Sequence, residues 1–310
     1  MTEGKFSLHK PVLLNEAISG LNFSGDGSGA IALDATFGGG GHSREILERF
    51  SKAEVIALDR DGSVWREDMW KKYKGRISFF CKDFRNLDEV LDGQKMNGII
   101  FDLGISSDQL GPPSGGSGRG FSFMRDEPLL MTMKENPGPE DLTAREIVNG
   151  WSEENLAKII YGYGEEKFAG RIAKEIAKER SIREIQSTFG LVRIIERAVP
   201  GRYKRGRIHF ATRTFQALRI AVNDELGALV QGLKKGLEFL AGASEGKAGG
   251  RMVVITFHSI EDRIVKNFFR EAAKEGRATI LNKKPIVPNA GEMKENPRSR
   301  SAKLRVLEKI

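Results

Sequence analysis

Short apolar runs that are followed by an acidic residue constrain the fold of this chain most strongly. Residues 30–33, 55–58 and 99–101 are such runs, and the residues that follow them are Asp34, Asp59 and Asp102. Residues 77–81 form a further run, and helical patterns separate the runs. Strands that alternate with helices are typical of βαβ units, in which helices cover both faces of a parallel sheet. The sequence therefore predicts an α/β fold with its ligand site at the carboxyl ends of the strands.

The pattern changes after residue 110 and returns near residue 210. Residues 111–120 are rich in Gly, Pro and Ser, which is a loop composition, and residues 143–199 read as helices. Apolar residues at three- and four-residue spacing predict one long helix over residues 215–240, and residues 251–257 read as a buried strand. We therefore predict a core in two parts, 1–110 and 210–310, and an inserted helical domain for substrate recognition over 111–209.

Composition excludes several classes of protein. The single cysteine, Cys81, excludes an intrachain disulfide, and the four histidines show no metal-ligand spacing, so we predict no metal. No apolar run approaches the roughly 20 residues that span a membrane, and the first residues lack the apolar stretch of a signal peptide. We expect a cytoplasmic protein without membrane contact. The oligomeric state stays open, a homodimer included.

Positive charge is concentrated in one segment. The net charge is +8, and residues 167–207 hold twelve Lys and Arg against four Asp and Glu. Clustered positive charge is typical of a protein that binds a polyanion. A solvated helix face would give the same pattern.

A glycine-rich turn after the first predicted strand indicates a cofactor. Gly38 begins four consecutive glycines, and Asp59 lies 21 residues further on, at the end of the second predicted strand. Glycines let the backbone approach a ligand closely, and an acid at this spacing can accept both hydroxyls of a ribose. The pattern favours an adenosine-containing cofactor. A dinucleotide enzyme is disfavoured because Ser43 replaces the third glycine of its motif, and a glycine turn without a ligand remains an alternative.

Several segments together resemble a known family. They are residues 9–16, 34–43 (DATFGGGGHS), 58–61, 101–110 (FDLGISSDQL), 119–126 (RGFSFMRD), 163–168, 212–219 (TRTFQALR), 257–263 and 296–300. In this order they resemble the RsmH (MraW) family of bacterial 16S rRNA (cytosine-1402-N4)-methyltransferases, nearly end to end. The resemblance implies a Rossmann-like class I methyltransferase core with an inserted helical domain. It also implies S-adenosylmethionine as cofactor and 16S rRNA, within the small ribosomal subunit, as partner.

The resemblance also implies cofactor contacts. Carried over by motif, they are Gly40, Gly41, His42, Asp59, Phe84, Asp102 and Gln109. From its position after the third predicted strand, Phe84 would cover the adenine face, and a place in the core is the alternative. Two positions depart from the family pattern, where Leu130 replaces an acid and Thr132 an arginine. These departures put RNA affinity or RNA choice in doubt, and they leave the cofactor motifs intact.

The chemistry points to Asp102. The exocyclic amine of cytosine is a poor nucleophile, because its lone pair is delocalised into the ring. An acceptor for an amino hydrogen would localise that pair and help to remove the proton, and Asp102 is the candidate general base. The motif around it differs from that of many amino-methyltransferases, so a purely cofactor-binding role stays open. Carbon-5 methylation would need a cysteine nucleophile, and Cys81, which we expect to be a small buried residue, is a poor candidate.

Other residues are candidates for contact with RNA. They are Arg119, Phe121, Phe123 and Arg125 in the loop after the fourth predicted strand, Arg202, Lys204, Arg205 and Arg207, and His258. Phe121 and Phe123 would stack on a flipped cytosine or anchor their loop, and His258 would face the target pocket or be structural. The four cations, with Tyr203 among them, would follow a phosphate backbone or form a solvated linker. A methyltransferase for another RNA or protein, and a non-catalytic rRNA-binding assembly factor, remain the alternative functions.

Overall fold

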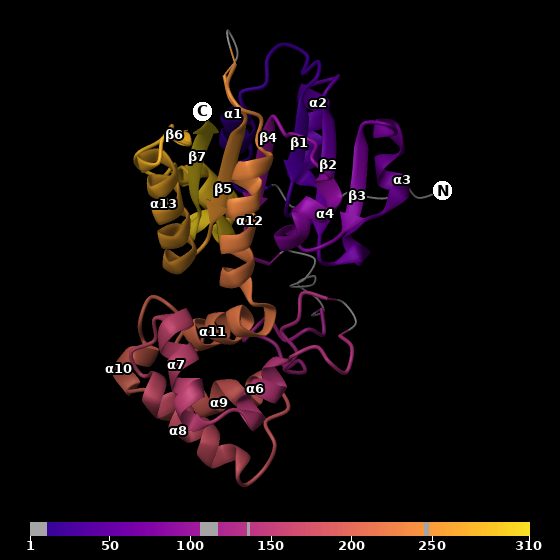
Figure 1. Ribbon diagram of the computed structural model, residues 1–310. Coiled ribbons are helices and arrows are strands. Elements are labelled where there is room, and N and C mark those ends of the chain that lie inside the picture. The colour runs from indigo at the N-terminus through magenta and orange to yellow at the C-terminus, as the bar shows by residue number, and fades with distance from the viewer. Residues whose placement is uncertain (1–10, 106–116, 135–136, 245–247) are drawn as a thin grey trace. The chain divides into compact units, whose positions relative to one another are not determined.

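The computed structural model describes residues 11–105, 117–134, 137–244 and 248–310. The chain divides into two compact units (Figure 1). The first contains the residues up to Gly104 and those from Leu226 onwards, and the second contains Ile105–Glu225.

A seven-stranded sheet forms the centre of the first unit. Its strands are β1 (Ile31–Asp34), β2 (Glu54–Asp59), β3 (Ile77–Cys81), β4 (Gly98–Asp102), β5 (Arg251–Thr256), β6 (Ala278–Ile280) and β7 (Lys303–Lys309). Their order across the sheet is β3-β2-β1-β4-β5-β7-β6. The first five strands pair in parallel, and β7 runs antiparallel to both of its neighbours. The predicted α/β fold is confirmed.

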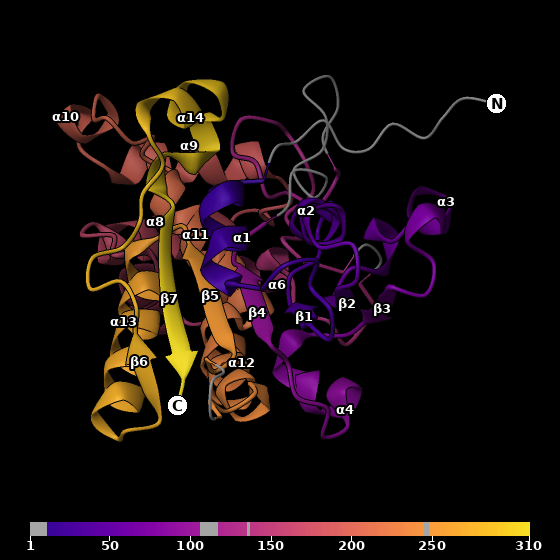
Figure 2. The ribbon, with the colours of Figure 1, turned by 90° about the horizontal axis from the view of Figure 1, so that it is seen from above.

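Helices cover both faces of this sheet (Figure 2). Apolar residues of α1 (Leu14–Leu21), α2 (Gly41–Arg49) and α3 (Glu67–Trp70) share one core cluster. Those of α4 (Leu87–Leu91), α12 (Glu225–Phe239) and α13 (Ser259–Lys274) share another. Successive strand residues point to opposite faces, so Ile100 joins the first cluster while Ile99 and Phe101 join the second. The shorter elements are η1 (Gly62–Val64), η2 (Lys71–Tyr73), η3 (Phe84–Asn86), α14 (Ala290–Glu295) and η4 (Pro297–Ser301).

The second unit is helical around its own apolar core. Its helices are α6 (Ala144–Gly150), α7 (Glu153–Gly164), α8 (Ala169–Arg180), α9 (Thr188–Ala198), α10 (Gly201–Lys204) and α11 (Thr212–Asn223). Thr143 and Glu146 form a reciprocal capping box at the start of α6. Gly164 lies so close to the backbone carbonyl of Arg213 that a Cβ atom would clash with it. The absence of that atom lets α7 and α11 pack closely.

The long helix predicted over residues 215–240 is wrong, because the structure breaks it at Asp224. Asp224 has the left-handed φ of 47° and ends α11, and α12 begins at the next residue. The amide of the buried Asn223 donates to the carbonyls of Met131 and Arg219, and its oxygen accepts from the amide of Met133. These bonds hold α11 in the helical unit. That unit therefore extends over Ile105–Glu225, beyond the predicted 111–209.

None of the described helices is long and apolar enough to cross a bilayer.

Candidate functional site

Three aspartates end three adjacent parallel strands. Asp34, Asp59 and Asp102 are the last residues of β1, β2 and β4, and β1 lies between the other two strands. Strand order reverses here, since the chain passes from β1 to β2 on one side and returns to β4 on the other. A crevice at such a switch point is where open α/β sheets bind ligands.

Asp59 is held by the glycine turn. Its Oδ2 accepts the amide hydrogen of Gly38 at 2.8 Å, and its Oδ1 accepts that of Asp61 at 2.9 Å. Burial raises the pKa of Asp59 to about 6, and the neighbouring charges of Asp61 and Asp34 add to the rise while the two amides oppose it. Each carboxylate oxygen can accept a second hydrogen bond, so Asp59 keeps the capacity to bind both hydroxyls of a ribose.

The glycines of the turn also meet a packing requirement. Gly40 has a φ of 70° and precedes α2, and a Cβ atom there would clash with the rings of Trp70 and Phe37. A Cβ atom on Gly41 would clash with Pro11. We predicted these glycines from the needs of a ligand, and the structure adds a steric reason that is independent of any ligand.

Two side-chain hydroxyl groups, which sequence analysis missed, form hydrogen bonds with residues at the strand ends. Ser43 Oγ donates to Asp34 Oδ2 at 2.6 Å, which ties α2 to β1. Thr36 Oγ1 accepts the amide hydrogen of Asp102 at 2.6 Å, which ties the turn to β4. Burial raises the pKa of Asp34 to about 6. Ser43 and Thr36 lie inside the glycine-rich motif, so their position in the sequence was the available signal.

His42 and Asp102 face each other at the site. His42 Nδ1 lies 3.7 Å from Asp102 Oδ2, too far for a direct hydrogen bond. Burial lowers the pKa of His42 to about 4, so its ring is neutral at pH 7. Burial, together with the charges of Asp34 and Glu261, raises the pKa of Asp102 to about 8. Within the described chain, His42 Nε2 and Asp102 Oδ1 are buried without a hydrogen-bond partner. Such atoms are suited to a polar ligand, because unpaired buried polar groups are costly.

Phe84 lies at the start of η3, after β3, with its ring half-buried. The ring packs edge-on against Phe101, with centroids 5.5 Å apart. A Cβ atom on Gly232 of α12 would lie 2.7 Å from the ring, so that glycine makes the space for Phe84, a role that sequence analysis missed. Gln109, the remaining predicted cofactor residue, lies outside the described residues.

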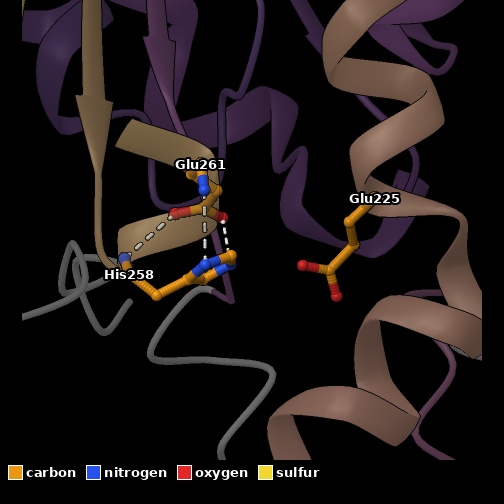
Figure 3. Close-up of side chains that lie close together, drawn as sticks. All are labelled: Glu225, His258 and Glu261. Carbon is orange, nitrogen blue, oxygen red and sulfur yellow. Dashed lines mark hydrogen bonds and ion pairs between the residues drawn. The ribbon is translucent and has the colours of Figure 1, made fainter. Parts of the chain in front are cut away.

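His258 has a structural role at the start of α13 (Figure 3). It is the N-cap of α13, where its Nδ1 accepts the amide hydrogen of Glu261 at 3.4 Å. The Glu261 carboxylate bonds back to the amides of His258 and Phe257, and His258 Nε2 lies 3.1 Å from Glu261 Oε1. This cap is the structural role that we named as the alternative for His258. Its Nε2 has no hydrogen-bond partner within the described chain, so contact with RNA stays a prediction. Glu225, also drawn in Figure 3, pairs with Arg219 of α11 at 2.8 Å.

Two of the predicted RNA contacts lie in the interior of the second unit. Phe121 is 8% exposed and belongs to its apolar core. Arg119 is equally buried, and its guanidinium donates to the carbonyl of Met133 at 2.9 Å. Neither side chain is presented to a macromolecule, so both predictions are corrected. Arg125 and Phe123 are half-buried, and Phe123 stacks on His209.

The basic segment 202–207 lies inside the second unit. Arg202, Arg205 and Arg207 are exposed, and none of their guanidinium groups has an ion pair or hydrogen bond within the described chain. Lys204 differs, because its Nζ lies 3.4 Å from Glu196 Oε1. The segment therefore presents three unpaired cations.

Tyr203, the aromatic residue of the segment, is held by contacts within the second unit. Its hydroxyl donates to the fully buried carboxylate of Glu166 at 2.5 Å, and its ring packs edge-on against Phe168. Burial and this bond raise the pKa of Tyr203 to about 12. Tyr203 is an anchor for α10.

The remaining sequence expectations concern three residues. Thr132 is buried, and its hydroxyl donates to the carbonyl of Lys134, while Leu130 is half-buried. Neither side chain is exposed, so the two departures from the family pattern change the packing of the helical unit and not its exposed surface. Cys81 is exposed at the end of β3, which corrects the expectation that it is buried.

The sheet order, the glycine turn and the aspartates at adjacent strand ends define an α/β protein that binds an adenosine-containing cofactor at the carboxyl edge of its sheet. Residues 6–310 match the model of the MraW methylase family, and the chain belongs to that family. It is therefore a methyltransferase, and the dinucleotide alternative is excluded.

Two relatives cover nearly the whole chain. One, from Persephonella marina, is named Ribosomal RNA small subunit methyltransferase H and is 42% identical over 307 residues, which cover 97% of this chain and 99% of the relative. One from Limosilactobacillus fermentum has the same name and is 39% identical over 324 residues, covering 97% and 98%. Among solved structures, an rRNA methylase from Streptococcus thermophilus aligns with a TM-score of 0.43 and 12% identity, covering 98% of this chain and 99% of that one.

Proposed function

We propose that this methyltransferase transfers the methyl group of S-adenosylmethionine to N4 of a cytosine in 16S rRNA, the position that the family resemblance numbers 1402. The observation that carries the proposal is the meeting of the glycine-rich turn with Asp59 and Asp102, which end β2 and β4 on either side of β1. The names of both relatives support the small ribosomal subunit as the source of the RNA. We place the reaction in the cytoplasm, on RNA within that subunit.

The residues present fit S-adenosylmethionine. Asp59 would hold the ribose hydroxyls, and Phe84, which is half-buried beside β3, would cover the adenine. The buried polar atoms without partners, His42 Nε2 and Asp102 Oδ1, would gain partners from the cofactor or the target base. When bound, the cofactor supplies an electrophilic methyl group on a sulfonium. The carboxylates nearby favour its positive charge.

Asp102 is the group that acts on the cytosine. Its carboxylate would accept a hydrogen bond from the exocyclic amine, which localises the nitrogen lone pair as the nitrogen attacks. It would then hold the proton that the amine loses. Burial favours this role, because it raises the pKa of Asp102 to about 8, closer to that of a useful base near neutral pH. His42, neutral and 3.7 Å away, does not compete as an ion-pair partner.

Mapping of modified positions tests the proposed function. Small-subunit RNA from cells that lack this protein should carry no N4-methylcytosine at the target, and incubation of those subunits with the protein and S-adenosylmethionine should restore one. Mass spectrometry of nuclease fragments locates the methyl group. Methylation found in a different RNA would show that this other RNA is the substrate. RNA binding without any methyl transfer would show that the protein is an assembly factor instead.

The cofactor site is tested by Asp59→Ala. We expect this variant to bind S-adenosylmethionine more weakly by about 1.5–3 kcal/mol, the scale of hydrogen bonds to a charged group. Calorimetry on the purified variant measures the change. Asp59→Asn, which keeps an acceptor for Gly38, is a second variant that separates cofactor binding from support of the turn. Unchanged affinity in both would remove Asp59 from the site.

A further inference from the structure

A stack of three rings stands beside the basic segment in the second unit. Phe123 and His209 are nearly parallel, with centroids 4.5 Å apart and an interplanar angle of 8°. His209 in turn stacks on Phe210, with centroids 4.3 Å apart and an angle of 29°. We propose that Phe123, His209 and Phe210, with Met124 and Ile208 beside them, form a surface that binds an unpaired RNA base. This inference rests on the proposed function, and it names a base-binding element for that function.

The stack is preformed. The edge of Phe123 packs against Phe215, which belongs to the apolar core of the unit, with centroids 5.7 Å apart. His209 Nδ1 accepts the amide hydrogen of Ala211 at 3.3 Å, which fixes the orientation of the ring. Burial lowers the pKa of His209, which favours the neutral ring. Phe123 and Phe210 stack on this central ring, so an added base would stack on the outer face of one of the two phenyl rings. A rigid ring loses little entropy when a base stacks on it.

Exposed apolar side chains border the stack. Met124 is 69% exposed and Ile208 is 53% exposed. Each is the chain neighbour of a stacked ring, since Met124 follows Phe123 and Ile208 precedes His209. Exposed apolar side chains next to stacked rings suit contact with the flat face of a base.

The positive charge near the stacked rings favours RNA as the ligand of this surface. Arg207 directly precedes Ile208, and Arg202 and Arg205 lie in the same segment, all three exposed and without a partner in the described chain. Single-stranded nucleic acid binds where cations meet phosphates and rings or apolar side chains meet bases. Because every base has a flat face, this surface should tolerate any base. It therefore binds a nucleotide that flanks the target and does not itself select cytosine.

The experiment compares variants that change no charge. Met124→Ser combined with Ile208→Ser removes exposed apolar surface, and His209→Ala removes the central ring. The matched control is Ile182→Ser, which changes an isoleucine that is 76% exposed elsewhere in the same unit. Binding to a fluorescent single-stranded fragment of small-subunit RNA is measured across a salt series, together with S-adenosylmethionine affinity and melting temperature.

We expect both test variants to bind the fragment about tenfold or more weakly, the scale of one lost base stack. The salt slope and the cofactor affinity should not change, and the control should bind as the wild type does. If both test variants bind the RNA fragment with an affinity within twofold of the wild type, the base-binding surface is wrong. It is also wrong if the variants keep their affinity for RNA and lose binding to a ribosomal protein. Methylation by the wild type is scored separately. A wild type that binds RNA through this surface but methylates no small-subunit RNA would contradict only the proposed function.

Discussion

Asp102→Asn is expected to lower methyl transfer at least tenfold while the fold stays intact. The substitution keeps the size of the side chain and removes its capacity to take a proton. Single-turnover rates on small-subunit RNA measure the effect, and calorimetry measures S-adenosylmethionine affinity in parallel. If the variant loses cofactor affinity in proportion to its rate, Asp102 is a binding group and the catalytic role is wrong.

The pH dependence gives Asp102 a second signature. Burial and the charges of Asp34 and Glu261 raise its pKa to about 8 in the folded protein, far above the usual 3.8. The base is therefore mostly protonated at pH 7, and kcat/KM for S-adenosylmethionine should rise with pH and level off above about pH 8. Asp102→Asn should show a low rate that does not rise over this range. A wild-type profile that is flat from pH 6 to 9 would contradict the assignment.

The same shift affects stability with a definite sign. Between pH 4 and 8 the folded state holds a proton on Asp102 that the unfolded state has released, so this group makes the folded state less stable as pH rises. Asp102→Asn lacks that titration. Its stability relative to the wild type should therefore increase from pH 4 to pH 8, as denaturant unfolding at both pH values would show.

Replacement of Arg202, Arg205 and Arg207 with Ala is expected to flatten the salt dependence of RNA binding by about 2–3 units. Each phosphate that a cation neutralises contributes about 0.7–0.9 to the slope of log affinity against log salt. Methylation of small-subunit RNA should fall steeply at physiological salt, while S-adenosylmethionine binding should persist, because the cofactor residues belong to the other unit. Lys204 is left in place because it faces Glu196.

A matched triple variant controls for the loss of net charge. Lys234, Arg270 and Lys283 are exposed residues of the first unit, and their replacement with Ala removes the same three charges. This variant should keep the salt slope and the rate of the wild type. Equal losses in both triple variants would show that overall charge, and not the 202–207 segment, attracts the RNA. Normal methylation by the test variant across the salt series would establish that the segment is a solvated linker.

Local sequence pattern determined the fold class and much of the candidate cofactor site. The first four predicted strands, the glycine turn and the three aspartates appear in the structure where the pattern placed them. The reason is that strand periodicity and turn chemistry are properties of neighbouring residues. Parallel strands then bring Asp34, Asp59 and Asp102 to one edge of the sheet without any further information.

Tertiary structure decided what depends on contacts between distant segments. The apolar spacing of residues 215–240 suits one helix, yet the bonds of Asn223 to Met131 and Met133 hold its first part in the helical unit. An aromatic residue among cations is typical of a base-stacking site, but the hydrogen bond of Tyr203 to the buried Glu166 makes this residue an anchor for its own helix. His258, by contrast, is decided locally, because it caps α13 through Glu261, only three residues further on. A side chain's type fixes which bonds it can make, and only the packing of remote segments fixes which partner it meets and whether it reaches solvent.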